Sequence, residues 1–365
     1  MKPHILVLIL DAARYDALAL AGGVSAMPGL QRLAGQSRVY TRAYCNAPWT
    51  LPSHASIFSG LPASRHGATQ QTLQMRADVP HLAEILHEQA GYRTYLFAAN
   101  DWFAAETGLA RGFEHLVGNP VHHGRPLQRR WRNLKAKLRR RLQAEARWSV
   151  SQRLVAAMLA TLDEAVSARQ PHFLFANLMD AHLPLRPSRD AAARFFDDPA
   201  EAEQARRLAL PVVEHRHVAG RRRLDARELS LLRRLYRAAL YDLDTTLAPL
   251  LDRLQQPHLR GRILLVVAAD HGEHLGEHGL IGHQFSVYQP LVRVPLLIHR
   301  DGEIDAAIID TPVQLSDLFP TLLRQAGLSP SAFGSNAGRD LLDDGLLSAR
   351  EDRAIFVEYA RPAMS

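Results

Sequence analysis

The stretch Ile263-Leu264-Leu265-Val266-Val267-Ala268-Ala269-Asp270-His271 decides the fold of this chain. A continuous apolar run of this length is typical of a strand that is covered on both faces of an α/β sheet. Asp270 and His271 follow directly at its carboxyl end, where open α/β sheets place their ligand crevices. A carboxylate next to an imidazole at such a point indicates a divalent metal site.

Segments that resemble strands and helices alternate along the rest of the chain. We expect strands at residues 5–10, 39–44, 93–98, 173–179 and 292–299, and helices at residues 52–60, 79–89, 225–256 and 315–327. This order predicts a layered α/β fold with a largely parallel central sheet and helices on both faces.

The composition is that of an ordinary globular protein that can bury a core. Hydrophobic residues make up 47% of the 365 residues, and the net charge of +7 favours anionic partners. Cys45 is the only cysteine, which excludes an internal disulfide and fits a reducing compartment. The apolar run at residues 5–10 is too short for a signal peptide or a membrane span. We therefore expect a cytoplasmic protein, of an oligomeric state that the sequence leaves open.

Two segments interrupt the alternation. Residues 125–147 hold ten Lys or Arg and one acid at a helical apolar spacing, so we expect a basic amphipathic helical insertion at about 125–150. It could pack on the domain or contact a membrane surface, whereas nucleic acid is disfavoured because no reader motif accompanies it. Residues 197–223 are rich in Ala, Arg and His, and we interpret them as a surface excursion or lid.

Polar residues follow several of the predicted strands, and one sheet edge would collect them. They are Asp11, Thr50, Asp180, His182, Asp270 and His271, and His283 returns to the same place after the loop 279–282. Each of these residues alone is a weak signal, so the prediction depends on their number. Thr50 also stands just before a helix N-terminus, which favours an anion.

This set of residues suits the cleavage of a phosphate or sulfate ester. Two carboxylates and a histidine can hold a cation, and a hydroxyl close to that cation loses its proton more easily. The hydroxyl can then attack phosphorus or sulfur, while the other histidines stabilise oxygens or protonate the leaving group.

Several motifs, in the order of a known family, cover nearly the whole chain. They are VLILDAAR (7–14), APWTLPSHASIFSG (47–60), NLMDAHLP (177–184), DHGEHLGEHGLIG (270–282), RVPLLI (293–298) and TPVQLSDLFPTL (311–322). With these motifs the chain resembles the sulfatase-like branch of the alkaline phosphatase superfamily. The resemblance implies an alkaline-phosphatase-like three-layer sandwich, with residues 1–330 as the catalytic domain.

The resemblance also implies roles for single residues. It makes Thr50 the nucleophile, and it makes His182 and His283 contacts of the transferred group. The implied metal ligands are Asp11, Thr50, Asp270 and His271. A second metal ion could be held by Asp180, His182 and His283, and Arg14 and His54 would line the site.

The chain departs from the sulfatase pattern at the nucleophile. Sulfatases carry a cysteine, matured to formylglycine, at the first position of Cys-x-Pro-x-Arg, whereas this chain has Thr50 there and His54 at the arginine position. Cys45 has neither Pro nor Arg at the required offsets. Threonine nucleophiles are typical of phosphodiesterases and phosphotransferases in this superfamily, so the resemblance favours a phosphorus ester over a sulfate ester as substrate.

Two further departures concern the metal and the C-terminal part. Ala12 replaces a second acid that is frequent in sulfatases, which favours zinc or manganese and leaves calcium and magnesium open. Relatives usually continue into a strand-rich C-terminal subdomain, and we expect only a short or missing one here, as a remnant at residues 331–365. We expect an anionic small-molecule, glycan or lipid ester as substrate.

Two other functions stay open beside phosphate ester hydrolysis or transfer. The first is sulfate ester hydrolysis. The second is a degenerate member that binds an anion or a partner without catalysis, although such binding would not require Thr50 or the Asp270–His271 pair. A zinc protease site at His274-Leu275-Gly276-Glu277-His278 is disfavoured, because glycines interrupt the helix that it would need.

Overall fold

The computed structural model describes residues 2–118, 149–168, 170–283, 286–334, 338–348 and 353–359. Its centre is an eight-stranded sheet with the order β11-β2-β10-β7-β1-β6-β4-β5. Only β10 runs antiparallel to its neighbours. In that order the strands are Ala307–Ile309, Arg38–Tyr40, Leu296–His299, Ile263–Ala268, His4–Leu10, His172–Leu178, Arg93–Ala98 and His115–Val117. The predicted mostly parallel sheet is confirmed.

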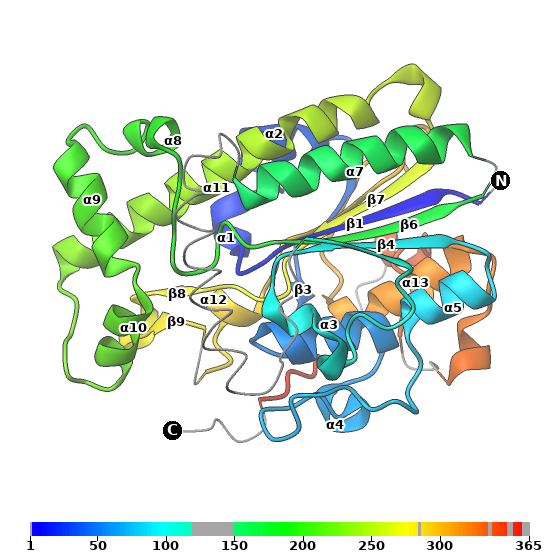
Figure 1. Cartoon of the computed structure of the whole chain (residues 1–365), viewed down its shortest axis with the longest axis horizontal. Helices are drawn as coiled ribbons and strands as arrows, with labels where there is room; N and C mark the ends of the chain where they lie inside the picture. The colour runs from blue at the N-terminus through cyan, green and yellow to red at the C-terminus, as the bar shows by residue number, and fades with distance from the viewer. Residues whose placement is uncertain are drawn as a thin grey trace, which may run out of the picture.

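Helices cover both faces of this sheet (Figure 1). One face carries α2 (Pro28–Ala34), α7 (Val150–Ser167) and α11 (Ala226–Leu254), and the other carries α3 (Thr50–Ser59), α4 (Ala63–His66), α5 (Leu82–Glu88) and α13 (Leu318–Gln325). The side chains of β1 and β7 are buried along their whole length, because both strands lie between the helical layers. This is the predicted three-layer α/β sandwich.

Smaller elements connect the layers. Two-stranded sheets are formed by β3 with β12 and by β8 with β9. These strands are Ala43–Tyr44, Val313–Gln314, His274–Leu275 and Ile281–Gly282. The short α-helices are α1 (Tyr15–Leu18), α8 (Arg189–Ala193), α9 (Pro199–Leu208), α10 (Pro211–Val218), α12 (Gln289–Val292) and α14 (Gly345–Ser348). The 3-10 turns η1 to η6 are Asp101–Phe103, Ala105–Thr107, Pro257–Leu259, Glu277–Gly279, Leu315–Asp317 and Pro330–Phe333.

Local chemistry sets the bounds of the helices near the site. The side chain of Asp225 accepts a hydrogen bond from the N–H of Glu228, and this capping box starts α11 one residue from the predicted bound. Gly60 ends α3 with a φ of 69°, in the left-handed region that favours glycine. Because Thr50 is the first residue of α3, its side chain lies at the positive end of the helix dipole.

Two predicted strands differ from the observed ones. Residues 39–44 are split by a turn: β2 ends at Tyr40 in the central sheet, and β3 pairs with β12 instead. The segment 292–299 forms a strand only from Leu296, because α12 extends to Val292 and Pro295 has no N–H to donate to a ladder. Both differences reflect tertiary pairing that an apolar run cannot reveal.

The segment 197–223, interpreted as an excursion, folds into α9 and α10. Arg234 of α11 forms an ion pair with Glu201 of α9 at 3.0 Å, and α10 packs against β9. The predicted basic insertion at about 125–150 lies almost wholly outside the described residues. The expected remnant at 331–365 is described in part, and the N–H of Glu358 there donates to Asn46.

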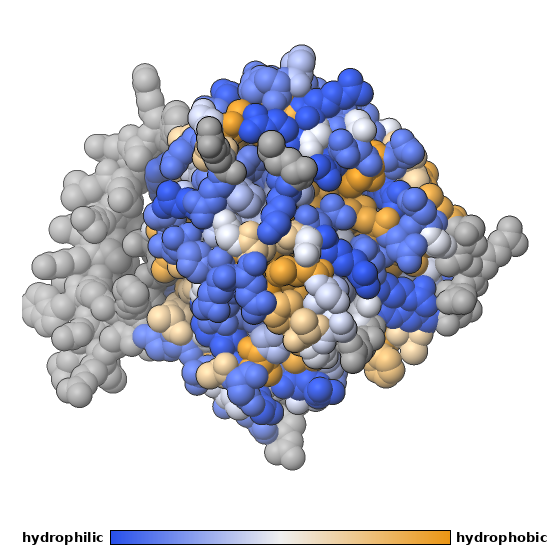
Figure 2. Space-filling model, turned by 90° about the vertical axis from the view of Figure 1, so that its right-hand side faces the viewer, coloured by the Kyte–Doolittle hydropathy of each residue, from blue (hydrophilic) through white to orange (hydrophobic). Residues whose placement is uncertain are grey.

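The surface is mixed in character. Hydrophilic side chains cover most of the face shown in Figure 2, and hydrophobic ones show between them, as on most folded domains. Among the described helices, none combines the length and the apolar character needed to cross a membrane.

Candidate active site

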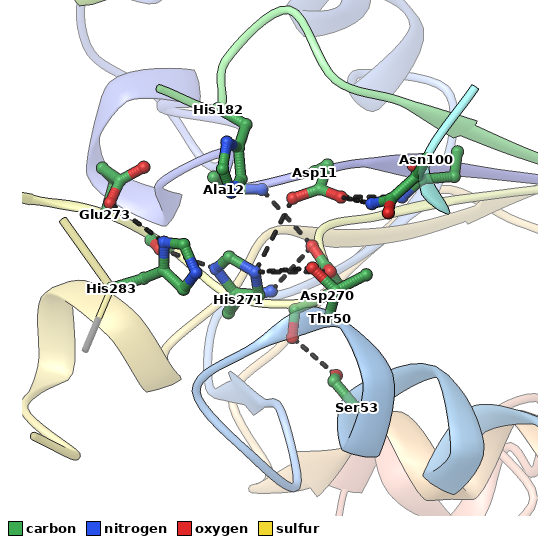
Figure 3. Close-up of polar contacts among 12 residues, drawn as sticks. Asp11, Ala12, Thr50, Ser53, Asn100, His182, Asp270, His271, Glu273 and His283 are labelled. Carbon is green, nitrogen blue, oxygen red and sulfur yellow. Dashed lines mark hydrogen bonds and ion pairs between the residues drawn. The ribbon is translucent and has the colours of Figure 1, made fainter. Parts of the chain in front are cut away.

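The carboxyl ends of β1 and β7 bring Asp11, Asp270 and His271 together, although 259 residues separate the first two in the sequence. The two strands are adjacent and parallel, so the residues that follow them meet at one sheet edge. All three side chains are fully buried. The Nε2 atom of His271 lies 3.6 Å from Oδ1 of Asp11 and 3.5 Å from Oδ2 of Asp270 (Figure 3).

Each carboxylate uses one oxygen for support and leaves the other facing the cluster. Oδ2 of Asp11 accepts hydrogen bonds from the amides of Asn100 at 3.1 Å and Asn177 at 3.0 Å. Oδ1 of Asp270 accepts from the backbone N–H groups of Ala12 at 3.3 Å and His271 at 3.0 Å. Among the described residues, the second oxygen of each carboxylate has no hydrogen-bond donor. Buried oxygens of this kind require another positive partner.

The tautomer of His271 completes a set of three acceptors. Its Nδ1 lies 2.9 Å from the carbonyl of Gly272, so Nδ1 carries the proton and Nε2 presents a lone pair. Burial and the nearby His283 keep the pKa of His271 well below its ordinary value, against the opposing charge of Asp11. Burial and the charge of Asp11 raise the pKa of Asp270 well above its ordinary value.

This donor set fits a divalent cation. The ligand atoms of Asp11, Asp270 and His271 lie within 4.8 Å of one another, and this is the one such group among the described residues. Two carboxylate oxygens and an imidazole nitrogen repel one another without a cation between them, and zinc and manganese accept both ligand types. Hydrogen bonds donated by Asn100 and Asn177 hold Asp11 in orientation, and the carbonyl of Gly272 accepts a hydrogen bond that orients His271, as is usual around protein metal ions.

Thr50 reaches the same cluster from α3. Its hydroxyl lies 3.4 Å from Nε2 of His271, and its side chain is almost fully buried. The preceding Trp49 is the N-cap, and an indole offers no acceptor to the first N–H groups of the helix. Ser53, one turn later, donates to the backbone carbonyl of Asp270 at 2.6 Å and so fixes α3 against the end of β7.

His182 and His283 lie on the other side of His271. The ring of His283 stacks on that of His271 with centroids 4.5 Å apart, and the ring of His182 lies 4.9 Å from His283. Nδ1 of His283 lies 3.4 Å from Oε1 of the buried Glu273. Burial alone would lower the pKa of His283, but its hydrogen bond to Glu273 and the surrounding carboxylates raise it. The structure thus places an imidazole with a nearby carboxylate beside the cluster.

The remaining predicted residues have other surroundings. Oδ2 of Asp180 accepts a hydrogen bond from Ser151 of α7, so Asp180 is not among the three clustered ligands. A second ion held by Asp180, His182 and His283 stays a prediction. Arg14 forms ion pairs with Asp16 and Glu277 and so braces the loop after β7.

His54 packs into the core next to the backbone of Thr50. It lies 2.8 Å from the carbonyl of Thr50 through Nδ1, and its ring packs edge-on against Phe103 and Phe175. Full burial lowers its pKa to about 4, so the ring is neutral. The position where the resemblance to sulfatases implied an arginine therefore holds a neutral core side chain in this chain.

Sequence reasoning missed the groups that hold Asp11 and its turn. Asn100 follows β4 and Asn177 lies near the end of β6, so the rule of polar residues at strand ends could have found both. Ala12 adopts a φ of 61°, which turns its N–H toward Asp270. The hydroxyl of Tyr236 in α11 holds this turn by donating to the carbonyl of Ala12 at 2.8 Å. No sequence pattern indicated that contact.

Comparisons with known proteins show what this chain is similar to. The chain is similar to arylsulfatase K from Gallus gallus, 21% identical over 340 residues, which cover 88% of this chain and 63% of that protein. It is similar to choline-sulfatase from Rhizobium meliloti (strain 1021), 25% identical over 90% of this chain and 68% of that protein. The chain therefore spans a little less than two thirds of arylsulfatase K.

A solved structure and a family model complete the comparison. The phosphonate monoester hydrolase of Agrobacterium radiobacter has the same fold, with a TM-score of 0.68 and 20% identity over 93% of this chain and 79% of that one. The model of the family described as Sulfatase matches residues 3–328. The chain belongs to the sulfatase family.

Proposed function

We propose that this chain is a metal-dependent hydrolase of phosphate esters with Thr50 as its nucleophile. The observation that carries the proposal is the hydroxyl of Thr50 at the N-terminus of α3, 3.4 Å from Nε2 of His271 and beside two carboxylates. A serine or threonine hydroxyl is a weak nucleophile unless its surroundings favour loss of the proton. The cluster supplies such surroundings.

Asp11, Asp270 and His271 would hold the cation, with Thr50 facing it. When bound, a divalent ion supplies Lewis acidity, which lowers the pKa of a neighbouring hydroxyl and offsets charge on the ester oxygens. The residues themselves hold the reacting groups in place, because α3 and the two strand ends are tied together by Ser53 and the Ala12 turn.

The positions of the side chains support a covalent step. The hydroxyl of Thr50 loses its proton to water, its Oγ1 forms a bond to phosphorus, and the bond from phosphorus to the leaving oxygen breaks. His283, whose pKa is raised by Glu273, can donate a proton to that leaving oxygen, with His182 beside it. Water afterwards cleaves the bond between Thr50 and phosphorus, and an alcohol in its place would make the reaction a transfer.

A second candidate is sulfate ester hydrolysis. It is favoured by the family match and by relatives named as sulfatases. Thr50 counts against it, since the family's sulfate chemistry uses formylglycine made from cysteine, and Cys45 is buried with a pKa that burial raises. Phosphate is therefore the first choice.

One set of assays tests the proposal. Aryl phosphomonoester, phosphodiester, phosphonate and sulfate substrates are each measured with zinc, manganese, magnesium and calcium. We expect a phosphorus ester to be turned over fastest, with zinc or manganese. A faster sulfate ester would make the second candidate correct.

Thr50→Ala tests the nucleophile. Its turnover should fall by on the order of 10⁴-fold or more, with the melting temperature of the metal-free protein close to wild type. Thr50→Ser is the matched control and should keep part of the activity. Wild-type rates in Thr50→Ala would contradict the assignment. A wild-type protein that binds no divalent ion would instead favour a non-catalytic anion-binding function.

A further inference from the structure

Helix α10 presents a polar buried face to the active-site hairpin formed by β8 and β9. Val213, Glu214 and His217 are its buried residues, and Glu214 and His217, three residues apart, share one side of the helix. Burying a carboxylate and an imidazole costs free energy unless both have polar partners. His217 contacts Gly279 of the hairpin, and Glu214 packs against Gly282, which directly precedes His283.

His217 ties α10 to the hairpin through a fixed tautomer. Its Nδ1 accepts a hydrogen bond from the N–H of Leu224 at 3.0 Å, so its Nε2 carries the proton. That N–H donates to the carbonyl of Gly279 at 2.9 Å. The turn of the hairpin is thereby held at a set distance from α10.

Glu214 reaches the residue that precedes His283. A Cβ atom built on Gly282 would lie 2.1 Å from Oε1 of Glu214 and 2.7 Å from its Cδ, so the carboxylate packs directly against that glycine. The backbone of Gly282 has a φ of 85°, which also favours glycine. Glycine at 282 thus lets a carboxylate from α10 approach the chain beside the imidazole.

His283 therefore has acidic side chains from two different elements around it. Glu273, from the loop after β7, meets its Nδ1 at 3.4 Å (Figure 3), and Glu214 comes from α10. Burial lowers the pKa of His283, and Glu273 and then Glu214 raise it. Burial and the charge of Glu273 raise the pKa of Glu214 itself to about 7.

We propose that Glu214 is a positioning residue for His283, and that α10 is for this reason a part of the active site rather than a surface excursion. Its carboxylate packs against Gly282 and places a second acid beside His283, so that the ring stays stacked on His271 and faces the transferred group. The inference rests on the proposed function, in which His283 donates a proton to the leaving oxygen.

Kinetics with a double-mutant cycle test the role. Glu214→Gln keeps the shape of the side chain and removes its charge. We expect kcat for the best phosphorus ester to fall about 10- to 100-fold, the range for residues that orient a functional side chain, with KM nearly unchanged. In a His283→Ala background the same change should have little further effect. Equal losses in both backgrounds would overturn the proposal, since they would show a general structural role.

A matched control and a readout that needs no turnover complete the experiment. Glu203→Gln removes an exposed acid from the neighbouring α9 and should leave kcat unchanged. With ¹⁵N-labelled histidine, the ring signals of His283, identified by their loss in His283→Ala, should shift in Glu214→Gln but not in Glu203→Gln. Unchanged His283 signals would overturn the positioning role whether or not the enzyme turns over. An inactive wild type with shifted signals would contradict only the proposed function.

Discussion

Two buried aspartate sites in this molecule show opposite chemistry. Asp317 is fully buried, and donors surround its carboxylate: the N–H groups of Gln314 at 2.8 Å and Arg339 at 2.9 Å, and the guanidinium of Arg353. Asp270 is equally buried, yet its Oδ2 has no hydrogen-bond donor and faces the acceptor atoms of the cluster. The nearby Nδ1 of His54 does not serve it, because that N–H is directed at the carbonyl of Thr50. The first site stabilises the fold by itself, whereas the second is suited to hold an ion.

The same substitution at the two positions should therefore have opposite results, and the largest effect is expected at Asp270. In Asp270→Asn, the amide oxygen can still accept the hydrogen bonds from the backbone N–H groups of Ala12 and His271. The substitution also removes a negative charge that burial and the charge of Asp11 disfavour. We expect turnover to fall by on the order of 10³-fold or more as the cation is lost. The metal-free variant should melt at or above the temperature of metal-free wild type.

Calorimetric metal titration and thermal melts with and without a chelator measure both parts of this prediction. Zinc or manganese should raise the melting temperature of wild type, because a ligand that binds the native state alone stabilises it. It should not raise that of Asp270→Asn. A variant that still binds metal tightly, or that unfolds without it, would break the contrast between the two sites.

Asp317→Asn should destabilise the fold and spare the chemistry. The new N–H₂ group would face the N–H donors that now serve the carboxylate, and breaking a buried ion pair costs about 3–5 kcal/mol. We expect a lower urea midpoint but an unchanged kcat per folded molecule, measured at a temperature where the variant stays native. A loss of kcat larger than the unfolded fraction explains would assign Asp317 to the site.

This contrast also explains which buried residues could be predicted from the sequence and which could not. Strand-end logic found Asp11, Asp270 and His271, because an apolar run and the polar residue after it lie next to each other in the chain. It did not reveal the structural role of Asp317, since that role depends on its donors, and Arg353 lies 36 residues away. Glu214 was missed for the same reason: only tertiary packing brings α10 to Gly282.

The order of elements was predictable where local signals act alone. The bounds of β4 and α11 agree with their patterns within two residues, since glycine and a capping box mark them. The split of residues 39–44 between two sheets depends on pairing with β12, 270 residues further along, and no local signal carries it.

The smallest expected effect concerns His81, a buried histidine that, like Asp317, has a structural role. His81 caps α5 by accepting from the N–H of Ala83 and stacks on Phe58. Burial, and then the charge of Arg111, lower its pKa from 6.5 to about 3. Below pH 6.5 His81 is therefore protonated in the unfolded chain but stays neutral in the folded chain. The free energy of unfolding consequently has its full value above pH 6.5 and decreases as the pH falls toward 3.

His81→Asn keeps an acceptor suited to the cap and removes the titrating ring. When the pH falls from 7 to 5, the free energy of unfolding of the variant should decrease less than that of wild type. The difference should be about 2 kcal/mol, because one histidine no longer takes up a proton on unfolding. Urea unfolding at the two pH values measures the difference, and His258→Asn, at an exposed position, is the control that should behave like wild type. An identical pH dependence in wild type and His81→Asn would mean that the ring is protonated in the fold. His81 would then need a carboxylate partner, as His283 has in Glu273, and the division between structural and functional buried groups would fail at this position.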